Sequence, residues 1–152
     1  MKDEIYNIIK QELKNNYQIL KEDNTRTIQD ARELEGRNSS RYDTMKIETS
    51  WLATSQIKRI ANLEEEINLS EHYILPKDPK IVKTGTLITV SNNGKTQKYF
   101  MLPFQRVKNI SYNNETIYLI SAQAPISKSL TNKKVGDETY FNKNKIVIEN
   151  IE

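Results

Sequence analysis

The sequence contains no cysteine, one histidine, four glycines and four prolines among 152 residues. The missing cysteines exclude disulfides, thiolate zinc sites and cysteine nucleophiles, and they are compatible with a reducing cytoplasm. A Ser-His-Asp triad could be built only around His72, which we expect to be an exposed linker residue. The chain has no long apolar run, so we expect neither a signal peptide nor a membrane span. We therefore expect a cytoplasmic protein.

The composition and charge favour small domains with a thin core. Hydrophobic residues make up 36% of the chain and charged residues 28%. The net charge of +3 is unevenly divided, because residues 1–70 hold 11 Lys and Arg against 13 Asp and Glu, and residues 71–152 hold 12 against 7. A basic C-terminal part suits an acidic protein surface or a weak phosphate contact, although most of these lysines are scattered singly and a solvated surface explains them better.

Two long segments without Pro or Gly show a helical pattern. Apolar or small residues recur at alternating steps of three and four, first from Met1 to about Leu34 and again from Tyr42. The first series is Tyr6, Ile9, Leu13, Asn16, Leu20, Asn24, Thr27, Ala31 and Leu34, and the second is Tyr42, Met45, Thr49, Leu52, Gln56, Ile60, Leu63 and Ile67. Gly36 can end the first helix, and Asn38, Ser39 or Ser40 can cap the second. The pattern predicts an antiparallel helical hairpin of about 45 Å over residues 1–70.

The expected contact between the two helices is unusually polar. Five polar residues occupy positions that a stable isolated coiled coil fills with Leu or Ile, and they are Asn16, Asn24, Thr27, Thr49 and Gln56. Such residues either fix the register of the two helices or leave the far half of the hairpin flexible. Trp51 is expected to pack within the hairpin or against the second domain.

After Ser70 the period shortens to that of β-strands, and short β-branched or aromatic runs follow. The expected strands are 73–75, 86–90, 98–102, 116–120, 138–141 and 145–149. Asn93-Gly94 and Asn113-Asn114 are typical of hairpin turns. With one helix starting at Pro125, the pattern predicts an α+β chain: the hairpin, then a small β domain over residues 71–152, with the boundary near residues 69–79.

The segment 124–138 carries the most specific pattern in the chain. Pro125 suits the first turn of a helix, Ile126 and Leu130 share one helical face, and Gly136-Asp137 breaks the chain before the next strand. The segment resembles the C-terminal signature of the GreA/GreB transcript-cleavage factors. Ala124 stands at the family's serine and Ser127 at its usual glycine.

The resemblance covers essentially the whole chain and implies a function. In the family, the C-terminal domain is FKBP-like and docks at the rim of the secondary channel of bacterial RNA polymerase, and the hairpin extends as a finger toward the active centre. The docking residues correspond to Gln123, Ala124, Pro125 and Ile126 here. Pro125 and Ile126 are equally explained by helix initiation and core filling.

The resemblance also places two acids at the finger tip, where the family helps the polymerase hold a second Mg²⁺ ion. Aligned on Tyr42, the first acid is Glu35 and the second position holds Asn38, which lacks the charge needed. The nearby acids Asp30, Glu33 and Asp43 are candidate substitutes, although exposure to solvent explains Asp30 and Glu33 and the dipole of the second helix explains Asp43. Partner contacts are expected from Asn38, Ser39, Ser40, Arg41 and Tyr42. The chain is expected to hold no metal of its own, and to depend on the Mg²⁺ of the polymerase if cleavage occurs.

Three functions remain open at this point. The first is a polymerase-binding elongation regulator that either stimulates cleavage of backtracked RNA or only occupies the channel. Such a regulator is not itself an enzyme, binds RNA polymerase core as a monomer, and contacts RNA and DNA only indirectly, without any membrane. The second is an FKBP-like peptidyl-prolyl isomerase or chaperone, and the third is a coiled-coil adaptor.

Overall fold

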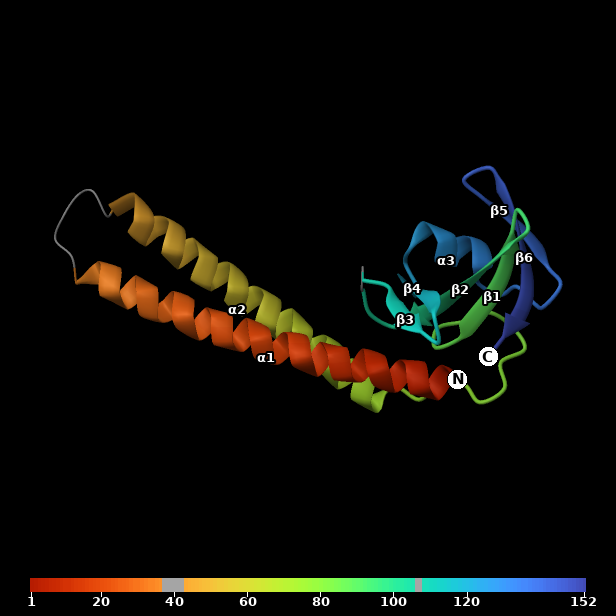
Figure 1. The fold of residues 1–152 in the computed structure, drawn as a ribbon, viewed down its shortest axis with the longest axis horizontal. Coiled ribbons are helices and arrows are strands. Elements are labelled where there is room, and N and C mark those ends of the chain that lie inside the picture. Colours follow the sequence, from red (N-terminus) through yellow and green to blue (C-terminus); the bar gives the residue numbers. More distant parts are fainter. Residues whose placement is uncertain (37–42, 106–107) are drawn as a thin grey trace. The chain divides into compact units, whose positions relative to one another are not determined.

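The computed structural model describes residues 1–36, 43–105 and 108–152, and it divides the chain into two compact units. Residues 7–71 form a helical unit, and residues 1–6 group with residues 72–152 in a sheet unit. Two long helices precede six strands and one short helix (Figure 1). The predicted α+β order of hairpin, small sheet and single short helix is therefore confirmed. In the described ranges, no helix combines the length and apolar character that crossing a membrane requires.

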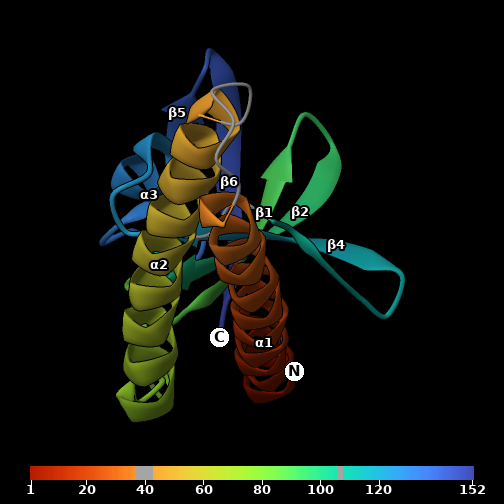
Figure 2. The ribbon, with the colours of Figure 1, turned by 90° about the vertical axis from the view of Figure 1, so that its left-hand side faces the viewer.

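The hairpin consists of α1, Lys2–Glu35, and α2, Asp43–His72, which lie side by side in the helical unit (Figures 1 and 2). Asp3 and Glu4 in the first turn of α1 and Arg32 in its last turn complement the helix dipole. Gly36 follows directly after the last residue of α1, as the sequence predicted. The predicted caps Asn38, Ser39 and Ser40 lie outside the described residues.

A polar pair fixes the antiparallel register of α1 and α2. The Asn24 side chain is buried, and its Nδ2 donates to Gln56 Oε1 at 3.1 Å and to the carbonyl oxygen of Ala53 at 3.3 Å. Further along the hairpin, the Tyr17 hydroxyl donates to Glu64 Oε1 at 2.6 Å. Because a buried amide needs hydrogen-bond partners, these bonds favour the observed alignment of the two helices and agree with the interpretation of Asn24 and Gln56 as register-fixing residues.

Replacing Asn24 by alanine should destabilise the hairpin by about 1 kcal/mol, because two hydrogen bonds lost outweigh the better helix propensity of alanine. Asn16 is exposed on the same helix and provides the matched control. Asn16→Ala should stabilise the hairpin by about 0.5 kcal/mol, since only propensity changes. Thermal unfolding followed by circular dichroism at 222 nm measures both effects, and an equal shift of the two variants would contradict the role given to Asn24.

The face of α2 that meets α1 differs from the predicted one in its first half. Met45 and Leu52 were expected in the contact and are exposed, as is Trp51, which was expected to pack. The half-buried positions with the same three-four steps are Lys46, Thr49, Ala53, Gln56, Ile60 and Leu63. Over the first half of α2, two sets of positions follow the same three-four spacing, one through Met45 and Leu52 and the other through Lys46 and Ala53. The large apolar side chains of Met45 and Leu52 favoured the first set, which is wrong. The Asn24 hydrogen bonds select the other.

The sheet has six strands in the order β3-β4-β2-β1-β6-β5. All neighbouring pairs are antiparallel except β2 and β4, which are parallel. The strands are β1 Leu87–Asn92, β2 Lys95–Leu102, β3 Ile110–Tyr112, β4 Glu115–Ser121, β5 Glu138–Phe141 and β6 Asn144–Ile151. Five of the six expected runs are confirmed as strands.

The expected strand at residues 73–75 is wrong, because this segment has no strand partner. Its Tyr73 hydroxyl instead donates to the carbonyl oxygen of Thr84 at 2.8 Å, so an aromatic residue typical of strands serves to hold a loop. The sixth strand, β3, was not predicted. It is only three residues long and follows an irregular connection, so its sequence pattern is too short to detect.

Three two-residue turns connect antiparallel strands. Asn93 and Gly94 both have positive φ, and so do Asn113 and Asn114, which confirms the two predicted hairpins. The third turn, Asn142-Lys143, joins β5 and β6 with φ of 48° and 66°. The sequence did not indicate it, because lysine is uncommon at positive φ.

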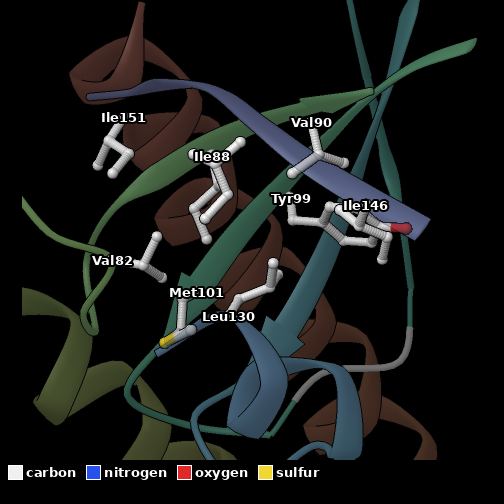
Figure 3. Packing of buried hydrophobic residues seen from close by; sticks show 9 residues of the cluster. Val82, Ile88, Val90, Tyr99, Met101, Leu130, Ile146 and Ile151 are labelled. Atoms are coloured by element: carbon white, nitrogen blue, oxygen red, sulfur yellow. The ribbon is translucent and has the colours of Figure 1, made fainter. Parts of the chain in front are cut away.

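A hydrophobic core lies between one face of the sheet and α3, Pro125–Leu130 (Figure 3). Leu130 packs there with alternate residues of the central strands, among them Ile88, Val90, Tyr99 and Met101. On β6, the core residues Ile146 and Ile148 are two apart, whereas the next, Ile151, is three further on. The pairing of β1 with β6 shifts register between Thr89 and Val90, and this bulge returns Ile151 to the core face.

The other face of the sheet buries Phe100, whose ring lies 6.0 Å from that of Tyr6 between centroids. Glu4 accepts a hydrogen bond from the hydroxyl of Tyr112, and Lys2 donates to the carbonyl oxygen of Pro76. These contacts belong to residues 1–6, which explains why the first turn of α1 groups with the sheet unit.

Burial raises the pKa of Tyr6 from 10.0 to about 12, and the nearby Tyr73 adds to the increase. The folded state therefore favours the neutral phenol of Tyr6. The contribution of this phenol to the free energy of unfolding is complete below pH 10 and is lost as the pH rises toward 12. Between pH 10 and pH 12, we expect the free energy of unfolding of the sheet unit to fall by about 2 kcal/mol more in the wild type than in the Tyr6→Phe variant. Urea unfolding at pH 9 and pH 11.5 tests this, and parallel losses in the two proteins would refute it.

Candidate functional site

The predicted docking residues surround the start of α3. Ala124 is the N-cap residue and has an extended backbone. Pro125 occupies the first turn, where the lack of an N–H costs no hydrogen bond because N–H groups there have no acceptor within the helix. The Ala124 N–H donates to the carbonyl oxygen of Ser121 at 3.1 Å, which closes the turn between β4 and α3. The helix start is thus held by backbone bonds and by the proline ring.

The side chains at this helix start divide between surface and core. Gln123 and Pro125 are exposed, and Ala124 is half-buried. Ile126 packs against the hydrophobic core beneath the helix, so its core role is real whatever else it contacts. Of the four predicted residues, Gln123 and Pro125 present the largest accessible surface to a partner.

Two neighbours of these residues escaped the sequence reasoning. Ala122 is exposed in the turn before Gln123, and Lys128 is exposed within α3. Lys128 lies three positions after Pro125 and therefore on the same side of the helix. This i, i+3 spacing was the signal that could have identified Lys128.

Ser127 is fully buried at the position where the resembling family has glycine. Its hydroxyl donates to the carbonyl oxygen of Ser121, and the Thr131 hydroxyl donates to the carbonyl oxygen of Ser127 at 2.6 Å. A buried hydroxyl with a partner costs little, so the serine is accommodated and ties the end of β4 to α3.

At the other candidate site, the described residues include the two expected acids but not the segment between them. Glu35 is the last residue of α1 and is exposed. Asp43 is the first residue of α2, and its Oδ1 lies 3.9 Å from Lys46 Nζ. The expected contact residues Asn38, Ser39, Ser40, Arg41 and Tyr42 lie outside the described residues.

The two acids differ in how well local structure explains them. A carboxylate at the start of a helix is favoured by the dipole, and Asp43 also has Lys46 one turn away, so helix stability accounts for it. Glu35 stands at the C-terminal end of α1, where the dipole disfavours a negative charge. Helix stability therefore gives no reason for Glu35, which strengthens its functional interpretation.

Neither acid belongs to a metal cluster. In the ranges 1–36, 43–105 and 108–152, no group of three or more His, Cys, Asp or Glu side chains is arranged to hold a metal ion.

A long helical hairpin followed by a six-stranded mixed sheet with one short helix defines the class of fold. Three solved structures are similar to this chain. The transcription factor Gfh1 shares 15% identity over 93% of this chain and 92% of that chain, with a TM-score of 0.38. GreA factor homolog 1 (Gfh1) of Thermus thermophilus shares 17% over 94% of each chain, with a TM-score of 0.38. Gfh1 of Thermus aquaticus shares 18% over 93% and 92%, with a TM-score of 0.36.

At these identities and scores, no function is transferred from those proteins. No protein-family model matches this chain, and no curated protein matches it.

Proposed function

We propose that this protein is a regulator of bacterial RNA polymerase that docks through the start of α3 and inserts its hairpin into the secondary channel. The observation that carries the proposal is the presence of both required parts in one chain. One is a hairpin of two helices with 34 and 30 residues, and the other is a sheet unit that presents Gln123 and Pro125 to solvent. At about 1.5 Å per residue, the helices are roughly 50 and 45 Å long, enough to reach into a deep channel.

The regulator is not itself an enzyme under this proposal, and its effect on RNA cleavage is weak. Glu35 supplies one carboxylate, and Asn38 supplies none at the position of the second. The Mg²⁺ of the partner polymerase would stabilise the attacking and leaving oxygens during hydrolysis. With a single acid beside that ion, occupation of the channel is the main effect.

Binding to core polymerase tests the docking part. Gln123→Asp combined with Pro125→Ala should weaken binding about tenfold, since both side chains are exposed and docking contacts are concentrated in few residues. Tyr140→Ala is the matched control, because Tyr140 is exposed on the edge strand β5, and this variant should bind as the wild type does. Ile126 is a poor choice for this test because it also packs in the core. Equal binding of all three proteins would contradict docking at α3.

An RNA cleavage assay on backtracked polymerase complexes tests the roles proposed for Glu35 and Asn38 at the tip of the hairpin. Asn38→Glu should raise RNA cleavage at least tenfold over the wild type, because it restores the second charge. Glu35→Gln in that background should remove the gain, whereas Glu65→Gln, far along α2, should leave it intact. Strong cleavage by the wild type, unaffected by Glu35→Gln, would refute the assignment of the tip.

The cavity described on the sheet unit does not favour the isomerase alternative. Proline recognition by an isomerase requires an apolar pocket. The cavity of about 310 Å³ on the sheet unit is lined mainly by Lys95, Thr96, Gln97, Lys98, Glu115 and Thr116, together with Tyr118. Such a polar lining does not suit a proline ring.

A further inference from the structure

The first part of α2 carries large apolar side chains that nothing in the described chain covers. The exposed fractions are 49% for Met45, 51% for Ile47, 71% for Trp51 and 53% for Leu52. Trp51 is the only tryptophan of the protein. Isolated exposed apolar residues are ordinary, but four within eight residues indicate an interaction surface.

Trp51 lies on a second regular face of α2, distinct from the face that meets α1, and Met45, Ile47 and Leu52 lie beside this second face. Residues four and three apart repeat along it, which is the spacing of a helix-packing seam. All its members are exposed, and they are Thr44, Glu48, Trp51, Ser55, Lys58 and Asn62. We call these six residues the Trp51 face.

The charges of the Trp51 face are complementary to those of the same face turned end for end. Glu48 lies before Trp51 and Lys58 lies after it, and neither has an ion-pair partner among the described residues. A second α2 placed antiparallel, with its Lys58 opposite Glu48, forms this ion pair twice, because two-fold symmetry repeats every contact. A parallel copy would instead place like charges level with each other.

The same alignment also matches the sizes of the side chains. With Glu48 opposite Lys58 of a second copy, Trp51 lies opposite Ser55, since both pairs are symmetric about the same point of the helix. The small serine leaves space for the indole ring, as a hole does for a knob. Leu52 lies beside the symmetry axis, where it approaches the Leu52 of the other copy.

We propose that the Trp51 face binds the Trp51 face of a second copy of this chain, with the two α2 helices antiparallel. This dimer replaces the monomer expected from the sequence, and it is independent of the proposed polymerase function. The added helix lies about 8–10 Å from α2 and widens the hairpin, so a paired hairpin and a hairpin inside a narrow channel exclude each other.

Sedimentation equilibrium of the full chain from micromolar to millimolar concentration tests the proposal. We expect a monomer-dimer equilibrium in which Glu48→Lys or Lys58→Glu raises the dissociation constant about tenfold, because each creates two like-charge contacts by symmetry. The double variant Glu48→Lys, Lys58→Glu should restore dimerisation. Glu65→Lys is the matched charge reversal outside the Trp51 face and should change the dissociation constant less than about twofold.

The fluorescence emission of Trp51 gives a second measurement of the monomer-dimer equilibrium. It should shift to shorter wavelength as the dimer forms, and Trp51→Ser should abolish association while leaving the helical circular dichroism unchanged. A monomer at every concentration overturns the proposal, and so does a double variant as weak as the single ones. An emission shift that occurs only with added polymerase would assign the Trp51 face to that partner and would equally overturn it, while leaving the proposed function intact.

Discussion

Replacing Gly85 by alanine should destabilise the sheet unit by about 3 kcal/mol. Gly85 has φ of +84°, where a side chain costs about 1–2 kcal/mol. An added Cβ would also lie 2.8 Å from Tyr73 Cε1 and 2.9 Å from Pro76 Cδ. Making room for it displaces the tyrosine, which loses its hydrogen bond to the Thr84 carbonyl oxygen, worth about 1 kcal/mol.

The variant Gly94→Ala serves as a control that separates the steric part of the stability loss at Gly85 from the part caused by positive φ. Gly94 has φ of +78°, but no atom of the described residues lies within 4 Å of the position that a Cβ would take. Gly94→Ala should therefore cost only about 1 kcal/mol. Urea unfolding followed by the near-ultraviolet circular dichroism of tyrosine measures both variants. Equal losses would mean that Tyr73 does not pack on Gly85.

Replacing Phe100 by alanine should have the largest effect of any single core change, about 4 kcal/mol. Phe100 is fully buried in the central strand β2, and its ring packs against Tyr6. Truncation removes apolar burial and leaves a cavity that rigid neighbouring strands cannot fill.

Tyr140→Ala is the aromatic control for Phe100, because Tyr140 lies on the edge strand β5 and is largely exposed. Its cost should stay within about 0.5 kcal/mol. A loss below about 1.5 kcal/mol for Phe100→Ala would contradict the packing of residues 1–6 on the sheet.

The parts of the fold predicted from sequence are those dictated by local chemistry. Asn93-Gly94 makes a turn because both residues tolerate positive φ. The proline start of α3 follows from its fixed φ. In each case a few consecutive residues contain the whole physical cause.

The errors arise where tertiary contacts decide between equivalent local patterns. Met45 and Leu52 fit the helical rhythm as well as Lys46 and Ala53 do, and the choice depends on hydrogen bonds from Asn24 on the other helix. Residues 73–75 have strand propensity, yet they pair with none of the six strands in the part of the chain that the structure describes.

The sequence predicted where the candidate docking residues lie in the fold, but it did not predict which of their side chains are exposed. The motif located Gln123 to Ile126, but only packing separates the accessible Gln123 and Pro125 from Ile126, which is part of the core. Lys128 was missed because the motif was interpreted along the chain and not around the helix. For the tip, the roles of residues 38–42 stay predictions.

The most direct test of the proposed mechanism is photo-crosslinking from position 36 to core polymerase. Gly36 lies next to Glu35, and among the described residues the nearest atom to a Cβ added there is the Glu33 carbonyl oxygen, at 3.6 Å. The proposal predicts crosslinks to polymerase segments that line the secondary channel near the active centre, and their loss in the Gln123→Asp, Pro125→Ala variant. Crosslinks confined to the outer surface of the polymerase, or none with a protein that binds, would contradict it.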